Sequence, residues 1–327
     1  MATEMTAASG LRVVRRGGLA GTVLLRVVGA IGVLWGAATL AFLAIYLSPG
    51  DPAYAVLGGE QANPSPAVLA QIRHEYGFDQ PWYVQYGTYL WKLVHGDLGR
   101  SYQLKEPVSQ AIGQQIGGTV QLAVTAGTLA ILIAVVVATL TAHRRRWIRG
   151  TSSAIDLTLA SMPSFWLGIL LLSAFSYGLH VFPAIGNKGW QSLVLPSVTL
   201  ALPLAAVLTQ VLRNALEEVF DQPFIQSARA RGLSDAYVRV RHALRHALIP
   251  LTTMAGFLVG GLFGGAVVTE TLFNRQGLGR LLLAAVNGKD LPIVIAVVVL
   301  SAGVYVITNL AVDLLYPLID PRLRRLA

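Results

Sequence analysis

The chain has 327 residues, of which 54% are hydrophobic and only 13% are charged. Soluble domains average about 25% charged residues, so roughly half of the usual charge is missing. The remaining charges cluster between long uncharged runs, which indicates an integral membrane protein. The chain contains no cysteine, which excludes disulfides, zinc thiolate sites and thiol catalysis.

The net charge is +9, a balance that nucleic-acid binding proteins also show. The basic residues lie beside apolar runs, however, where anionic lipid and the cytoplasmic bias of Lys and Arg account for them. We therefore expect these residues to contact membrane lipid, and we expect no nucleic acid among the partners.

Apolar runs need about 20 residues to cross ~30 Å of hydrocarbon. Barrel strands would instead appear as ~10-residue alternating segments, which this sequence lacks. The first run is longer than the ~7–15 residues of a signal-peptide core, which favours a retained helix. The predicted fold is an all-α polytopic membrane protein with six transmembrane helices, at Val23–Leu47, Thr119–Ala142, Leu157–Leu179, Leu193–Leu212, Ile249–Thr269 and Pro292–Tyr316.

Arg and Lys are enriched before the first run, between the second and third, between the fourth and fifth, and after the sixth. Cytoplasmic segments carry this excess, so both termini are predicted to face the cytoplasm. The expected organisation is a cytoplasmic tail (1–22), a first helix (23–47), an extracytoplasmic loop domain (48–118), a five-helix core (119–317) with a cytoplasmic loop at 213–248, and a cytoplasmic tail (318–327).

The long loop after the first run carries two helix patterns, and unstructured loops of this length are uncommon. Ser65 and Pro66 begin the first helix, and Gly77 ends it. The second helix starts near Trp82 and ends at Gly96, and its aromatic side chains suit the headgroup layer. Two interpretations stay open: a cap lying on the membrane, or a landing surface for a soluble partner.

The loop between the fourth and fifth runs also predicts two helices. Asp221 is the expected N-cap of a short helix with Pro223 in its first turn. Gly232 ends that helix, where left-handed backbone suits glycine, and Ser234 caps a second helix over residues 235–246. Small residues on the first helix would let it lie in a partner's groove. A basic helix on the membrane surface is the alternative.

Glycine is frequent in the fifth run, at a spacing that lets helices pack closely. Gly277 and Gly279 are predicted to be turn glycines of an outer loop. No G-x4-G-K-[ST] phosphate loop occurs in the chain. The glycines of the fifth run are Gly256, Gly260, Gly261, Gly264 and Gly265.

The motif Gln226-Ser227-Ala228, followed by Gly232, resembles the EAA loop of ABC-importer permeases, whose consensus is Glu-Ala-Ala-x3-Gly. Gln226 stands for the Glu and Ser227 for the first Ala. Further segments are similar to the oligopeptide/dipeptide/nickel branch of these permeases, and the long first loop indicates its B-type subunit. In chain order these segments cover nearly the whole sequence: Ser48–Ala53, Ile72–Tyr86, Gly96–Tyr102, Ser161–Leu171, His242–Pro250, Val267–Val286 and Asn309–Arg324.

The resemblance implies a bacterial inner-membrane protein that forms half of a translocation path with a second, similar permease subunit. It also implies two cytoplasmic ABC ATPase subunits, which would hold ATP and Mg²⁺, and an extracytoplasmic solute-binding protein. We expect no catalytic residue, metal or cofactor in this chain itself. Relatives of this kind carry peptides, nickel, haem-like or sugar-like solutes, and di- or oligopeptides are the expected substrate.

Three groups of site residues follow from the resemblance. The loop over 221–250 would couple to the ATPases, the glycines of the fifth run would pack helices or face the path, and an outer-loop motif would follow that run. The coupling residues are Gln226, Ser227, Ala228, Arg229, Arg231 and Gly232, and the outer-loop residues are Glu270, Phe273, Gly277 and Gly279.

A stand-alone secondary transporter or channel is the alternative function. Such a protein normally needs ionisable groups deep in the membrane, whereas Asp156, Glu270 and Asp313 all fall near the ends of runs. An intramembrane enzyme is a third hypothesis, which needs a metal or a nucleophile–base pair. His242 and His246 are four apart, but no Glu follows the first His as in H-E-x-x-H.

Overall fold

The computed structural model describes residues 19–57, 63–186 and 189–319. Most of the two predicted tails, at 1–22 and 318–327, lies outside the described residues. The described part of the chain is helical, apart from its loops and one isolated bridge between Arg100 and Pro107. The prediction of an all-α fold is therefore confirmed.

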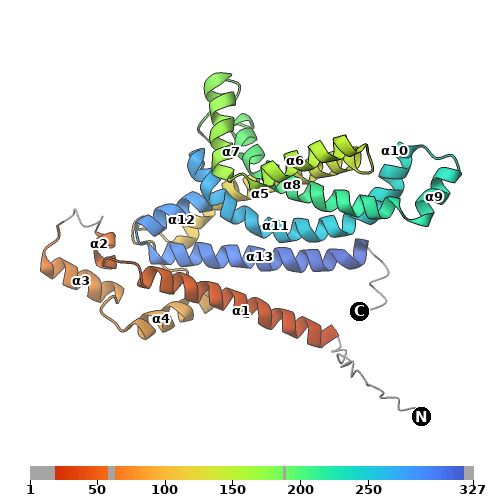
Figure 1. Ribbon diagram of the computed structural model, residues 1–327. Helices are drawn as coiled ribbons and strands as arrows, with labels where there is room; N and C mark the ends of the chain where they lie inside the picture. Colours follow the sequence, from red (N-terminus) through yellow and green to blue (C-terminus); the bar gives the residue numbers. More distant parts are fainter. Residues whose placement is uncertain (1–18, 58–62, 187–188, 320–327) are drawn as a thin grey trace, which may run out of the picture.

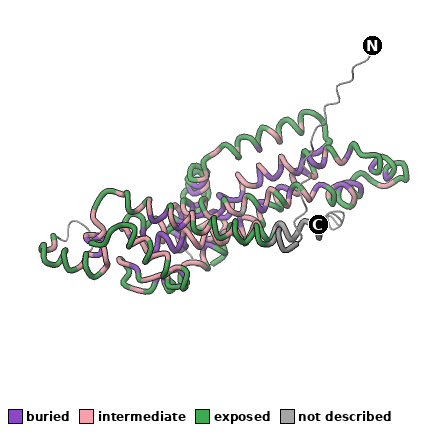
Figure 2. The backbone as a smooth tube through the Cα atoms, turned by 90° about the horizontal axis from the view of Figure 1, so that it is seen from below, coloured by how far each residue is buried: buried purple, intermediate pink, exposed green. Residues whose placement is uncertain are grey.

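Long helices run side by side through the molecule (Figure 1). Within them, α5 presents a row of buried alanines four residues apart, and small side chains let helices approach closely. This explains why α8 packs mainly against α5 and then against α11. Figure 2 shows the buried residues concentrated along the inner helices. The long helices are α1 (Leu19–Tyr46), α5 (Val108–Thr141), α8 (Gln191–Phe220), α11 (Leu244–Leu272) and α13 (Leu291–Ile319).

Four helices of the described residues are long and apolar enough to cross a membrane. Two pairs of bent helices raise the number to six if each pair is one span. The four continuous candidates are Leu24–Tyr46, Val108–Thr141, Gln191–Phe220 and Leu291–Ala311.

The predicted third span, Leu157–Leu179, is not one helix. It covers the end of α6 (Arg146–Ser161), all of α7 (Ser164–Leu171) and the π-helical segment η2 (Leu172–Gly178), with a bend of 104° between α6 and the α7–η2 pair. The bend lies at Met162-Pro163, because proline has no N–H to donate and disfavours helical backbone at the residue before it. Figure 1 shows α7 leaving the bundle at this point.

The helix predicted over 235–246 does not end before the fifth span. α10 (Asp235–Tyr237), the π-helical segment η3 (Val238–Ala243) and α11 follow one another without a loop. Pro250 lies inside α11, and a bend of 50° separates residues 235–258 from residues 260–272. The loop and the span were predicted as separate elements because charge and hydropathy change there, whereas the backbone remains helical.

Two other helices are longer than predicted. α5 begins at Val108 rather than Thr119, and α8 continues to Phe220 rather than Leu212. The extensions contain polar residues, which hydropathy excludes from a span. Their apolar side chains, such as Ile112 and Leu216, are nevertheless buried in the core.

Three short helices, α2 (Pro52–Val56), α3 (Pro66–Tyr76) and α4 (Trp82–Val94), form a cap before α5. The predicted ends of α3 are confirmed: Ser65 accepts a hydrogen bond from the N–H of Val68 at 3.4 Å, and Gly77 adopts a φ of +71°. α4 packs against α1 through Tyr86, Leu90 and Leu93. The aromatic residues left exposed on α4 are Trp82, Tyr83 and Trp91.

Candidate functional site

α9 (Pro223–Ala230) lies at the same end of the molecule as the start of α1 and the end of α13 (Figure 1). Its N-cap is Gln222, whereas Asp221, the predicted cap, ends α8. Gly232 follows the helix at φ +80°, and its N–H donates to the carbonyl of Arg229 at 2.9 Å. The helix and its terminating glycine are thus where the sequence predicts them, with the N-cap one residue later.

The two faces of α9 differ in environment. Ile225 and Ala228 are buried, at 0% and 1% exposed, in the core cluster that α5, α8 and α11 share. Ala228 therefore packs inside this chain. The opposite face is open, with Phe224 at 41% exposed beside the exposed Gln226 and Ser227. A short helix with one face anchored and the other exposed can present a surface to a partner.

The two arginines of the predicted coupling set have different contacts. Arg229 donates to the carboxylate of Asp235 at 3.2 Å, and its guanidinium lies 5.7 Å from the ring centroid of Phe220. Arg231 is exposed, and its Nε donates to the backbone oxygen of Ser227 at 3.3 Å. Arg229 is therefore engaged within the loop, while the charge of Arg231 faces outward.

Arg239, which the sequence did not single out, has the most contacts in this loop. Its Nε donates to Asp235 at 2.7 Å, and its Nη1 donates to the carbonyls of Ala142 at 2.7 Å and Thr139 at 3.2 Å. The guanidinium also lies 4.8 Å from the ring centroid of Phe220. The spacing of Asp235 and Arg239 is the i,i+4 pattern of a helical ion pair. This ion pair was therefore predictable from the sequence, whereas the bonds of Arg239 to Thr139 and Ala142 were not.

The glycines of the fifth run divide into two sets. A Cβ on Gly260 would overlap the ring of Tyr305, and one on Gly265 would come within 2.9 Å of Leu200, so both allow packing inside this chain. Gly256 is buried. A Cβ on Gly261 or Gly264 would meet nothing within 4 Å. These two exposed glycines share one face of α11 with the exposed residues Phe257 and Val268.

Glu270 organises the turn between α11 and α12 (Leu278–Asn287). Its carboxylate is 0% exposed and accepts hydrogen bonds from the Thr119 hydroxyl at 2.6 Å and from the N–H of Gly279 at 2.8 Å. A Cβ on Gly277 or Gly279 would overlap this carboxylate or the backbone beside it. Phe273 is buried at 2% exposed against the α7 and α8 ends. All four outer-loop residues thus belong to one packed turn.

A buried ion pair joins three helices at the level of α6. Arg213 of α8 and Asp156 of α6 are 3% and 5% exposed, with nitrogen and oxygen 2.5 Å apart. Arg213 also donates to Thr141 of α5 at 3.1 Å and to Ser152 of α6 at 2.8 Å. Sequence reasoning placed Arg213 in a cytoplasmic loop, because α8 was expected to end at Leu212.

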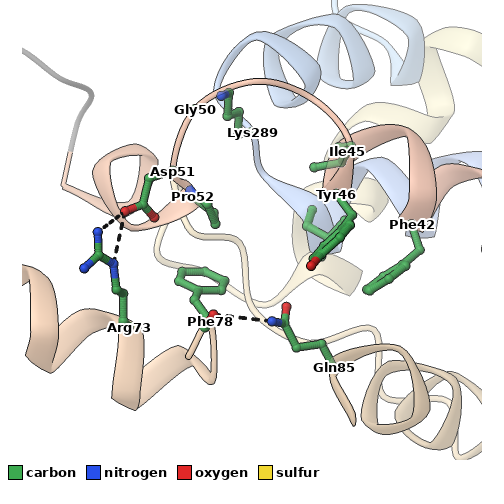
Figure 3. A pocket seen from close by; sticks show the side chains of 11 residues that line it. Phe42, Ile45, Tyr46, Gly50, Asp51, Pro52, Arg73, Phe78, Gln85 and Lys289 are labelled. Carbon is green, nitrogen blue, oxygen red and sulfur yellow. Dashed lines mark hydrogen bonds and ion pairs between the residues drawn. The ribbon is translucent and has the colours of Figure 1, made fainter. Parts of the chain in front are cut away.

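The cap encloses a cavity of about 230 Å³ next to the end of α1 (Figure 3). Asp51 accepts from Nε and Nη2 of Arg73 at 3.1 and 2.5 Å, and it caps α2 through the N–H of Ala53 at 2.9 Å. Burial acts to raise the pKa of Asp51, but the Arg73 and Ala53 hydrogen bonds outweigh it and lower that pKa below its ordinary value. Lys289 donates to the carbonyl of Pro49 on the same side.

Asp290 fastens the segment after α4 to the start of α13. The side chain is 0% exposed and accepts hydrogen bonds from the Ser101 hydroxyl and from the N–H groups of Tyr102 and Gln103, the latter two at 3.2 and 3.1 Å. The partners are nearly two hundred positions apart in the chain, so no local pattern predicts them.

Long apolar helices and a short helix that is exposed at one end of the bundle describe a membrane protein with a surface open to partners. Family comparison agrees: the inner membrane component of binding-protein-dependent transport systems matches residues 106–325, and the N-terminal part of that membrane component matches residues 21–123. The chain therefore belongs to this family, the permeases of ABC importers, and is a multi-pass protein of the bacterial inner membrane.

Curated relatives are similar over almost their full length. A Brucella abortus protein named as a peptide transport system permease is 40% identical over 311 residues, which is 92% of this chain and 98% of the relative. The glutathione transport system permease of Salmonella choleraesuis is 37% identical over 303 residues, with the same coverage of 92% and 98%.

The fold resembles a solved transporter. The MetNI methionine ABC transporter in an inward-facing form aligns with a TM-score of 0.57 and 20% identity, covering 64% of this chain and 97% of the other. At this identity the likeness describes the fold alone.

Proposed function

We propose that this chain is one of two permease subunits of an ATP-driven importer of di- and oligopeptides. The peptide assignment is supported by the names of its relatives, one for peptides and one for glutathione, which is itself a tripeptide. A solute-binding protein on the outer side would deliver the peptide, and two ATPases on the inner side would drive its passage.

The proposed topology has six spans with both termini in the cytoplasm. Each bent pair of helices counts as one span in this proposal. The start of α1, the α9 loop and the end of α13 share one end of the molecule (Figure 1). The excess of Arg and Lys in the segments at that end supports a cytoplasmic location for it.

The observation that carries the proposal is α9, anchored by Ile225 and Ala228 and open on its other face. In the proposal this open face, with Phe224, Gln226 and Ser227, lies in a groove of an ATPase subunit. Arg231 is exposed beside it and would pair with acidic residues of the ATPase.

In this proposal ATP drives transport by changing the populations of the outward-open and inward-open states. ATP binding closes the two ATPases, α9 moves with its groove, and the spans rock so that the path is exposed first to the outside and then to the inside. A ligand shifts such an equilibrium only by binding the two states with different affinity. A difference in affinity of a few kcal/mol is therefore what ATP binding must supply through α9.

The second permease subunit would lie against the open face of α11. Gly261 and Gly264 leave the middle of this face, between Phe257 and Val268, without side chains, and small residues let helices of two subunits approach closely. In this proposal the face meets the second permease beside the central path for the peptide.

Reconstitution tests the whole proposal. The chain, a second permease and the ATPase pair are placed in liposomes with a peptide-loaded binding protein, and uptake is followed with and without ATP. We expect uptake only with ATP and all components. Peptide uptake by this chain alone, driven by an ion gradient, would instead establish the stand-alone transporter.

A further inference from the structure

We infer that Arg239 is the link through which α9 moves α5, so that the motion reaches a helix to which the loop is not covalently joined. This inference rests on the proposed function, in which α9 receives the motion of an ATPase. α9 is connected through the chain to α8 and to α11, whereas its connection to α5 is made by side chains alone.

The end of α5 supplies acceptors that need a donor. The last carbonyls of a helix have no partner within the helix, and cations near that end are favoured by its dipole. Nη1 of Arg239 donates to two such carbonyls, Ala142 at 2.7 Å and Thr139 at 3.2 Å. The Arg239 side chain is 6% exposed, so these bonds are shielded from water.

The other side of the guanidinium is tied to α9. Asp235 accepts from Arg239 through one carboxylate oxygen at 2.7 Å and from Arg229 of α9 through the other at 3.2 Å. Both guanidinium groups also lie over the ring of Phe220 at the end of α8. The contacts therefore run from Arg229 of α9 to Asp235, from Asp235 to Arg239, and from Arg239 to the end of α5. The ring of Phe220 packs against both guanidinium groups.

The two halves of this connection differ in exposure: the Arg239 side chain is 6% exposed, whereas Asp235 and Arg229 are 46% and 37% exposed. Charged hydrogen bonds in a shielded site resist separation more than exposed pairs do. Arg239 is therefore held firmly to the end of α5, and in this inference its bond to Asp235 passes a displacement of α9 on to that end. Without Arg239, a displacement of α9 would still move α11 through the backbone, but the end of α5 would move less.

The test replaces Arg239 in the reconstituted importer and measures peptides transported per ATP hydrolysed. Arg239→Met keeps the long side chain but removes every hydrogen bond. We expect assembly and ATP hydrolysis to persist, while transport per ATP falls about tenfold or more, the factor that a charged hydrogen bond is worth. Arg241→Met is the matched control, because Arg241 is exposed in the same segment, and it should transport normally.

Two milder variants keep the test informative if Arg239→Met does not fold. Arg239→Lys retains a charge for the α5 carbonyls but not the fork that also reaches Asp235, and Asp235→Asn weakens the tie to α9. Both should give intermediate transport per ATP. A normal ratio in all three variants overturns the link.

A distance measurement separates this inference from the proposed function. Since the chain has no cysteine, spin labels can be placed at Gln222→Cys and Leu140→Cys, both exposed positions. We expect their separation to stay constant on ATP binding in the parent and to change in Arg239→Met. No ATP-dependent uptake by the parent defeats the proposed function, whereas unchanged uptake and unchanged distances in Arg239→Met defeat only the link.

Discussion

At the scale of single residues, Glu270 holds the α11–α12 turn through acceptors that only a carboxylate supplies in full. In Glu270→Gln one oxygen becomes an amide nitrogen, which cannot accept from Thr119 or Gly279. A buried donor without an acceptor costs about 1–3 kcal/mol, so we expect a lower melting temperature of the purified protein. Glu218→Gln, at an exposed position, is the control. Equal melting temperatures for both variants would contradict this role.

Two glycine-to-alanine changes should differ in their effect on the free energy of unfolding. A Cβ on Gly279 would overlap the backbone of Val267, which cannot rotate away, whereas one on Gly117 of α5 meets nothing within 4 Å. Overpacking costs typically ~1–3 kcal/mol, and alanine in place of an unconstrained helical glycine gains ~0.4–1 kcal/mol. Chemical denaturation in detergent should therefore place Gly279→Ala below the parent and Gly117→Ala at or above it. A stable Gly279→Ala would show that the turn is loosely packed.

Residues with local signals were predictable, and residues paired over long distances were not. Ser65, Gly77 and Gly232 act on the backbone beside them, so the sequence alone indicated their places. Arg213 and Asp156 are 57 positions apart, and Ser101 and Asp290 are 189 apart. Their importance depends on which helices lie side by side, which a one-dimensional pattern does not contain.

At the scale of elements, the end of α9 depends on Gly232. The φ of +80° is unfavourable for side chains with a Cβ, by about 1–2 kcal/mol, although nothing lies within 4 Å to clash. We expect Gly232→Val to uncouple ATP hydrolysis from uptake while membrane insertion is retained, because the turn after α9 is strained. Asn adopts left-handed backbone more readily, so Gly232→Asn should transport better.

The matched control for this change is Gly150→Val. Gly150 is an exposed glycine inside α6 without a positive φ or a close neighbour, so it tests the effect of a valine alone. Peptide uptake and ATP hydrolysis are measured on the same preparations. Uptake by Gly232→Val equal to that of the control would count against α9 as the moving element.

The attachment of α3 to the rest of the cap should depend on pH, because Arg73 of α3 pairs with Asp51 next to α2. Asp51 has a pKa below its ordinary value, so its ion pair with Arg73 stabilises the fold above that ordinary value and is lost as pH falls through the depressed one. We therefore expect α3 to stay attached at neutral pH and to loosen only below about pH 4. Hydrogen exchange of α3 amides, corrected for intrinsic rates, measures this.

Asp51→Asn separates the ion pair from the helix cap, because asparagine can still accept from the N–H of Ala53. Its α3 amides should exchange faster than the parent's at neutral pH and show little further change in acid. An identical exchange profile for parent and variant would mean that α3 is held by other contacts.

Elements were predicted best where caps mark their ends. α3 and α9 are bounded by Ser, Pro and Gly signals, and their predicted bounds hold to within one residue or so. The break between α6 and α7 was missed, because hydropathy averages over Leu157–Leu179 without registering Pro163. The role of Pro163 depends on its neighbours, since Pro196 and Pro203 lie inside the continuous α8.

At the scale of the whole molecule, the open face of α11 should decide pairing with a second permease. Gly264→Trp adds a large side chain where nothing lies within 4 Å, so the chain itself should fold normally. The indole would separate two closely packed subunits, and we expect co-purification of the second permease to fall while monomer stability is kept. Undiminished co-purification would place the partner on another face.

The overall class of the protein was accessible from composition and motif order, whereas its shape was not. Apolar runs and Arg-rich segments gave the approximate positions of the long helices. The direction of α7 and the continuity from α10 into α11 required the structure, because both depend on how helices pack after the runs are formed.

The ion pair of Arg213 and Asp156 limits how the bundle can rearrange. Sliding α8 past α6 by one turn, ~5.4 Å, would strand two opposite charges in an apolar interior, where isolated ions are very unfavourable. Pivoting about the pair leaves it intact. We therefore expect α5, α6 and α8 to pivot about this ion pair during transport and not to slide past one another.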